Sequence, residues 1–203
     1  KLIQLNDVTG EAEEVSIAIQ GIIASCVLPP FELRSSRPNK AKQLAHARQS
    51  ITITGLGSKS FDNIVQNCRH MYTMFIPEFI SKYRDAGNGG AIESPALTAS
   101  SCFFTPVKQA SGFNVVSINP ELDPHGILGK VDATKWVHTE DNKVGYYIQT
   151  SHADQNRQVD KAPKLNIGDI VEIQASMLSL PSKGTYTVKL ILRSIVLLDG
   201  HLT

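Results

Sequence analysis

The chain has 203 residues, of which 41% are hydrophobic and 19% charged, so it can bury a sizeable core as one domain or two small ones. Its 20 basic and 19 acidic residues leave a net charge of +1, which excludes a polycation that holds nucleic acid by overall charge. The three cysteines, Cys26, Cys68 and Cys102, form no C-x-x-C pair, which argues against a disulfide scaffold or zinc site and indicates an intracellular setting, nuclear or cytoplasmic.

The N-terminal region is acidic and then strand-like. Four acidic residues stand among the first fifteen, unlike a secretory signal. Residues 15–28 alternate around Gly21, which predicts one long strand with a bulge at the glycine, ended by two prolines. This apolar run is interrupted by Gln20 and is too short to span a bilayer, so we expect no membrane contact.

A basic segment follows at residues 33–60, where six basic residues occur without an acidic one. Within it, residues 39–49 favour a short helix and residues 50–56 a short strand. Apolar residues then recur at three- and four-residue spacing, which predicts an amphipathic helix near residues 60–84 with Ser60 as N-cap and a kink at Pro77. Cys68 falls on the apolar stripe, as is typical of a packed core thiol.

The second half of the chain reads as short strands and turns. Strand-like runs occupy residues 102–107, 113–118, 127–131, 135–138 and 144–150. Trp136 and Tyr147 flank a Glu-Asp-Asn turn, which predicts a hairpin over residues 136–147. After a polar loop at 151–165, a long hairpin over residues 166–198 closes the chain, and the far half of its second arm should be covered on both faces.

These elements predict a mainly β fold with one amphipathic helix near 60–84, in one of two architectures. In the first, residues 113–198 form an antiparallel β-barrel that resembles the oligonucleotide/oligosaccharide-binding (OB) barrel, with Gly168-Asp169 introducing its fourth strand. In the second, the N-terminal strands join a jelly-roll-like two-sheet barrel. The boundaries we expect are an N-terminal strand-helix region (1–86), a flexible loop or linker (87–100) and a β-barrel (101–203), with one continuous domain left open.

Three strings near the end of the chain, HTEDNKV, LNIGDIVEIQ and LILRSIVLLDG, are similar to tail segments of uncharacterised proteins of mushroom-type fungi. That resemblance implies a eukaryotic intracellular setting. It implies no activity.

Motifs of catalysis are missing from the sequence. There is no Gly-rich phosphate loop, G-x-S-x-G elbow or H-E-x-x-H, and the six histidines have no ligand spacing. His152 and Asp154 lie in a polar loop, where a solvated pair is the ordinary interpretation. We therefore expect no enzyme, no cofactor and no metal.

Two features remain that fit nucleic acid. The basic segment would neutralise phosphates through its cations, although such a run is as often a solvated face. The predicted hairpin would present a stacking platform of aromatic and histidine side chains flanked by lysines, although the single tryptophan of a small barrel is more often packed in its core. The candidate binding residues are Arg34, Arg37, Lys40, Lys42, Arg48, Lys135, Trp136, His138, Lys143 and Tyr147.

The sequence thus favours a non-enzymatic nucleic-acid-binding β-barrel whose partner is single-stranded DNA or RNA. Two other classes stay open: a self-assembling capsid-like jelly-roll protein, for which large homo-oligomers are expected, and a protein-protein adaptor domain without nucleic acid. The location of Trp136 and of the basic segment on the surface separates these hypotheses.

Overall fold

The computed structural model describes residues 1–5, 10–30, 44–75, 95–149, 156–159, 162–182 and 185–200. Its strands are β1 (Ile3–Leu5), β2 (Ala12–Glu14), β3 (Ser16–Val27), β4 (Arg48–Thr54), β5 (Ala96–Cys102), β6 (Thr105–Pro106), β7 (Trp136–Val137), β8 (Gly145–Gln149), β9 (Asn156–Val159), β10 (Ile170–Ser182) and β11 (Thr185–Asp199). The helices are α2 (Lys59–Phe75) and the 3-10 turns η2 (Val107–Gln109), η3 (Leu128–Lys130) and η4 (Glu140–Asn142). The expected mainly β fold with one amphipathic helix is confirmed; Pro77 lies outside the described residues.

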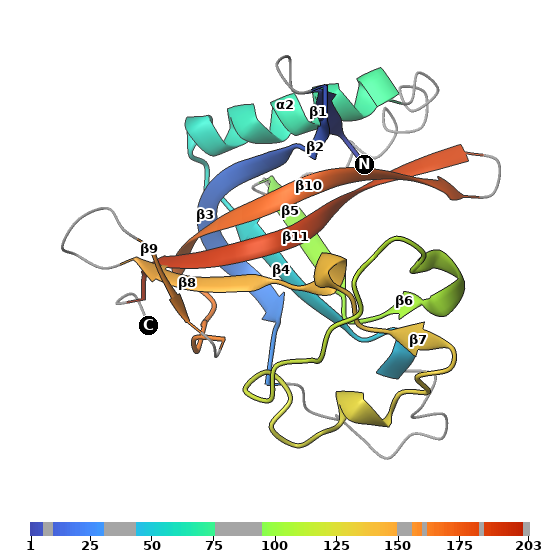
Figure 1. Ribbon diagram of the computed structural model, residues 1–203. Coiled ribbons are helices and arrows are strands. Elements are labelled where there is room, and N and C mark those ends of the chain that lie inside the picture. Colours follow the sequence, from blue (N-terminus) through green and yellow to red (C-terminus); the bar gives the residue numbers. More distant parts are fainter. Residues whose placement is uncertain are drawn as a thin grey trace.

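Five strands form a ring in the order β3, β4, β5, β11, β10 and back to β3 (Figure 1). The pairings are antiparallel except that of β5 with β11, which is parallel and short. This five-stranded Greek-key ring is OB-like rather than a jelly roll of two facing sheets. Beyond its short pairing with β5, β11 pairs in parallel with β8, and β8 pairs in turn with β9, antiparallel. The sheet is therefore mixed and not purely antiparallel.

The expected range of the barrel, residues 113–198, is right only for its last two strands. The first three strands of the ring come from residues 16–102, whereas residues 103–143 form an irregular segment around a small second core of Phe103, Phe104 and Leu128. The predicted strands at 113–118 and 127–131 are an isolated bridge and a 3-10 turn. A local side chain favours the turn over a strand at residues 127–131, because the Asp123 carboxylate accepts from the backbone N–H of Ile127 and of Leu128, each at 2.8 Å. The domain boundaries expected at residues 86 and 101 stay a prediction.

The closing hairpin is confirmed as β10 and β11, which pair from Ile170 and Asp199 to Ser182 and Thr185. A register shift opposite Gln174 and Ala175 places a bulge at Arg193, and it changes which side chains face the core. Beyond the bulge, Ile195 and Val196 point to opposite faces and are both buried, at 0% and 2% exposure, so this part of the arm is covered on both faces, as the sequence led us to expect.

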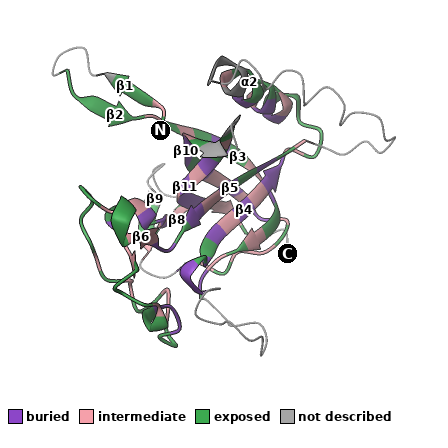
Figure 2. Cartoon of the chain, turned by 90° about the vertical axis from the view of Figure 1, so that its right-hand side faces the viewer, coloured by how far each residue is buried: buried purple, intermediate pink, exposed green. Residues whose placement is uncertain are grey.

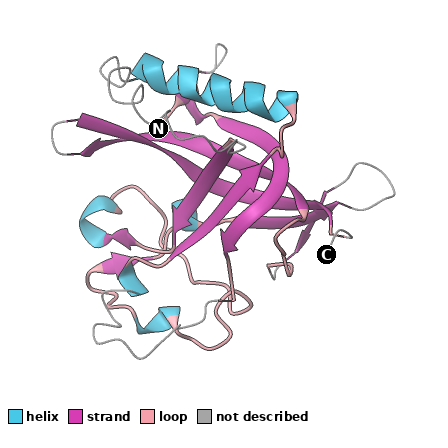
Figure 3. Ribbon diagram, turned by 180° about the vertical axis from the view of Figure 1, so that it is seen from behind, coloured by secondary structure: helices cyan, strands magenta, loops and turns pink. Residues whose placement is uncertain are grey.

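Helix α2 lies over the ring beside β3, and the irregular segment lies at the opposite side of the ring (Figure 3). Cys68 is buried in the main core, as predicted. Phe61 fills a niche that Gly21 and Gly55 leave open: a Cβ at Gly55 would come within 2.3 Å of the Phe61 Cβ. The bulge of β3 lies between Ile23 and Ser25, not at Gly21, where the missing side chain instead makes room for the Phe61 ring.

The β1–β2 hairpin, largely exposed in Figure 2, is held to the sheet by an ion-pair cluster, while the backbone N–H of Leu2, just before β1, donates to the carbonyl of Met177 on β10 at 2.9 Å. Arg193 donates from Nε to the Glu14 carboxylate at 2.8 Å and from Nη1 to the backbone carbonyl of Asp141 at 2.7 Å. Lys1 donates from Nζ to the side-chain carboxylates of Glu14 and Asp141. Burial alone would raise the pKa of Glu14, but three hydrogen-bonding side chains outweigh it and hold that pKa at about 2.

This cluster makes stability depend on acid pH. Because the folded pKa of Glu14 lies below its ordinary value of 4.5, its contribution is complete above that value and is lost as the pH falls towards 2. Between these limits the unfolding free energy of the wild type should fall by about 1 kcal/mol more than that of Glu14→Gln, after solvent screening of this partly exposed group. Urea unfolding at a series of pH values measures the difference, and parallel pH profiles of the two proteins would contradict the assignment.

Candidate nucleic-acid interface

The cations of the basic segment are divided between described and undescribed residues. Arg34, Arg37, Lys40 and Lys42 lie outside the described residues. In the chain they belong to the connection between β3 and β4, the first two strands of the ring. Arg48 opens β4, is exposed, and forms no ion pair with another described residue.

The predicted aromatic hairpin is wrong. Trp136 lies on β7, which pairs with β6, whereas Tyr147 lies on β8, which pairs with β9 and β11. The intervening Glu-Asp-Asn sequence forms the 3-10 turn η4, because the side-chain oxygen of Asn142 accepts from the backbone N–H of Thr139 at 2.9 Å. Trp136 and Tyr147 are therefore not cross-strand neighbours.

Both aromatic side chains are half-buried, each in a different place. Trp136 packs against the second core and meets the His46 ring edge-on, with 5.3 Å between ring centroids. The Tyr147 ring lies over Gly145, where a Cβ would approach it to 2.7 Å. Trp136 is neither a plug of the main core nor a fully displayed stacking surface.

The two predicted lysines differ in their surroundings. Lys135 is exposed and forms an ion pair with Asp132 at 2.8 Å, which raises the pKa of the lysine. Lys143 is exposed and has no ion pair among the described residues. Of the two, Lys143 has its charge available for a ligand.

The surroundings of His138 disfavour its charged form, in contrast to a phosphate-binding cation. Burial lowers its pKa, and the nearby Lys143 charge adds to this, against a hydrogen bond to the backbone carbonyl of Phe103 that acts the other way. That bond joins Nδ1 to the carbonyl oxygen at 2.7 Å, so Nδ1 carries the proton and Nε2 has a free lone pair.

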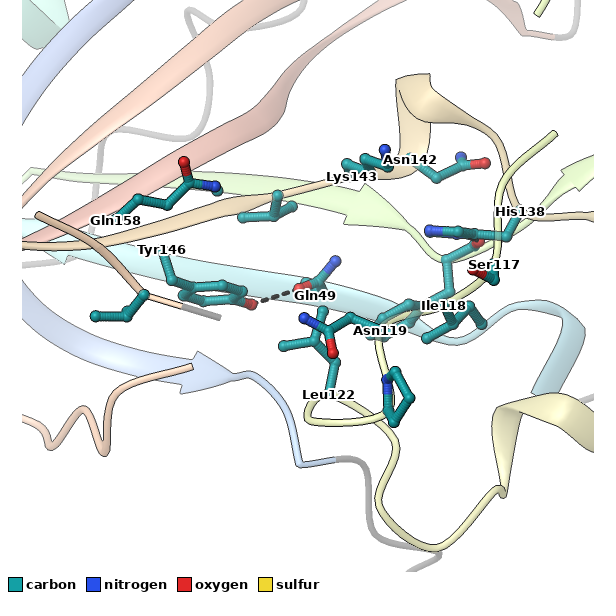
Figure 4. A pocket seen from close by; sticks show the side chains of 15 residues that line it. Gln49, Ser117, Ile118, Asn119, Leu122, His138, Asn142, Lys143, Tyr146 and Gln158 are labelled. Carbon is teal, nitrogen blue, oxygen red and sulfur yellow. Dashed lines mark hydrogen bonds between the residues drawn. The ribbon is translucent and has the colours of Figure 1, made fainter. Parts of the chain in front are cut away.

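A cavity of about 360 Å³ brings His138 and Lys143 together with residues from other elements. Figure 4 shows it between β4, β8 and the loop that carries Ser117 and Asn119. At its base the Tyr146 hydroxyl donates to Gln49 Oε1, and burial raises the pKa of this tyrosine. A second cavity of about 420 Å³, mostly apolar, contains Trp136 and shares His138 with the first.

Sequence reasoning missed Gln49 and Tyr146. The signal was present in the alternation of β4, since Gln49 is in phase with the core residues Ile51 and Ile53 and is as buried as they are. A polar side chain at a core-facing position requires a partner or a ligand.

Two negative observations complete the site. Among the described residues, no three His, Cys, Asp or Glu side chains gather as a metal site. Within the same parts of the chain, no helix is long and apolar enough to cross a membrane. His152 and Asp154 lie outside the described residues.

Comparison with known proteins gives structural likenesses only. No protein-family model matches the chain, and no curated protein matches it in sequence. A single-stranded DNA-binding protein encoded by bacteriophage T7 is similar at 12% identity and a TM-score of 0.43, with 91% of each chain covered. The single-stranded DNA-binding protein of bacteriophage Enc34, in its complex with single-stranded DNA, is similar at 12% identity and a TM-score of 0.40, with 91% of this chain and 86% of that chain covered.

Proposed function

We propose that this protein is a non-enzymatic, intracellular nucleic-acid-binding module whose ligand is single-stranded DNA or RNA. The observation that carries the proposal is the position in the chain of four cations of the basic segment: Arg34, Arg37, Lys40 and Lys42 belong to the connection between β3 and β4, the first two strands of an OB-like ring. OB barrels bind oligonucleotides with the loop between those strands and with the face of the second and third strands.

The outward face of β4 and β5 suits contact with a sugar-phosphate backbone. Ser50, Thr52, Thr98 and Ser100 give this face small side chains with hydroxyls, and the Thr52 and Thr98 hydroxyls meet across the strands at 2.9 Å. Hydroxyl and backbone groups are common phosphate partners. Arg48 stands at the end of this face, where it pairs with Cys102.

The proposal is tested by fluorescence anisotropy with labelled oligothymidylate and oligouridylate of about 20 nucleotides, at a series of salt concentrations. We expect micromolar or tighter binding at low salt, with log affinity falling linearly against log salt by roughly 0.7 per phosphate contact. Binding that is absent, or insensitive to salt, would overturn the proposal. A duplex of the same length is the control and should bind more weakly.

A further inference from the structure

The Gln49 amide nitrogen faces the cavity without a partner. Gln49 is only 1% exposed, and its Oε1 accepts from the Tyr146 hydroxyl. Its Nε2 donates no hydrogen bond to another described residue, and Figure 4 shows this nitrogen on the side of the amide away from Tyr146, among the residues that line the cavity. An amide N–H at the wall of a cavity can be satisfied there by a ligand or by water.

The cavity presents an acceptor as well as this donor. His138 lies on its wall, and because Nδ1 donates to Phe103, the lone pair of Nε2 is the group left for a ligand. None of the described residues that line the cavity is acidic, and Lys143 is the charged one. The site therefore suits a neutral polar group that is attached to a negative charge.

A nucleobase with its phosphate has this chemistry. Each base offers carbonyl or ring-nitrogen acceptors beside N–H donors on one planar edge, and proteins read an unstacked base by hydrogen bonds to that edge. A volume of about 360 Å³ is within the range of small-ligand sites.

We propose that this cavity receives one unstacked base of the bound single strand. In it, the Gln49 amide donates to an acceptor of the base and His138 accepts from one of its N–H groups. Lys143 contacts an adjacent phosphate. This inference rests on the proposed function and adds to it a place where bases, and not only the backbone, are held.

The test uses a variant that fills the cavity and a matched control. Ser117 is exposed and lines the cavity, whereas Ser111 is exposed on the same segment and does not line it. Ser117→Trp should weaken binding of labelled oligothymidylate by about tenfold, while Ser111→Trp leaves it unchanged, since one held base contributes roughly that factor. Gln49→Met, which removes the amide and keeps the length of the side chain, should show the same loss. On an abasic oligonucleotide of equal length, all four proteins should bind alike.

The outcomes separate the two proposals. Equal binding of oligothymidylate by Ser117→Trp, Gln49→Met and Ser111→Trp would overturn the base cavity and leave nucleic-acid binding standing. A loss for Ser117→Trp and Gln49→Met that is as large on the abasic strand would also overturn it, because the base would then play no part. A wild-type protein without salt-sensitive binding to any strand would overturn the proposed function and the base cavity with it.

Discussion

Neutralising four cations of the basic segment together is expected to weaken single-strand binding by roughly a hundredfold at low salt, the largest functional effect we predict. The substitutions are Arg34→Gln, Arg37→Gln, Lys40→Gln and Lys42→Gln. A glutamine in place of a cation does not neutralise a phosphate, so the condensed counterions of that phosphate are no longer released on binding. The slope of log affinity against log salt should therefore become shallower by about 2.8, as anisotropy titrations would measure.

The matched control changes the same net charge at exposed cations elsewhere, through Arg69→Gln, Lys108→Gln, Lys130→Gln and Lys164→Gln. If binding depends on the basic segment, this control should keep nearly the wild-type salt slope. Equal losses in both quadruple variants would mean that only overall charge matters. The assignment of the segment would then be wrong.

Phe61→Ala is expected to cause the largest loss of stability, about 3–5 kcal/mol of unfolding free energy. Phe61 is 3% exposed and is the side chain of α2 that enters the niche at Gly21 and Gly55. Gly21 on β3 and Gly55 directly after β4 cannot fill the space left behind, because neither has a side chain. Thermal unfolding followed by circular dichroism should show a midpoint lower by roughly 10 °C.

Gln66→Ala is the control for this variant, since Gln66 is exposed on the same helix. Alanine favours helix slightly more than glutamine does, so its midpoint should stay within a degree or two of the wild type. A Phe61→Ala protein as stable as Gln66→Ala would show that α2 contributes little to the core. It would then be an appendage of the ring.

Secondary structure is predicted best from the sequence where one periodic pattern of apolar residues extends over many residues. The hairpin of β10 and β11 and the start of α2 have clear periodicity, and the structure has both. The short strand expected at 135–138 is present as β7, whereas prediction failed at residues 113–118 and 127–131, which resemble strands, and at the hairpin turn expected near residues 140–142. There, Asp123, Thr139 and Asn142 satisfy backbone groups through their side chains and turn the chain instead.

The ring itself was misplaced for a different reason. Its closure depends on the pairing of β10 with β3 and of β11 with β5, between residues far apart in sequence, and no local pattern carries that information. The same limit applies to the cavity, whose wall joins Gln49 on β4 to Tyr146 on β8. Both residues were visible in the sequence, but their proximity was not.

The two strands that complete the ring are the last of its strands to leave the ribosome. Until residues 170–199 emerge, β3 and β5 each keep an edge of unpaired backbone N–H and C=O groups, which can pair with another nascent chain. A chain that stops short of Ile170 is therefore an aggregation hazard rather than a smaller working protein. The same long-range closure makes folding slow relative to that of a helical protein of equal size.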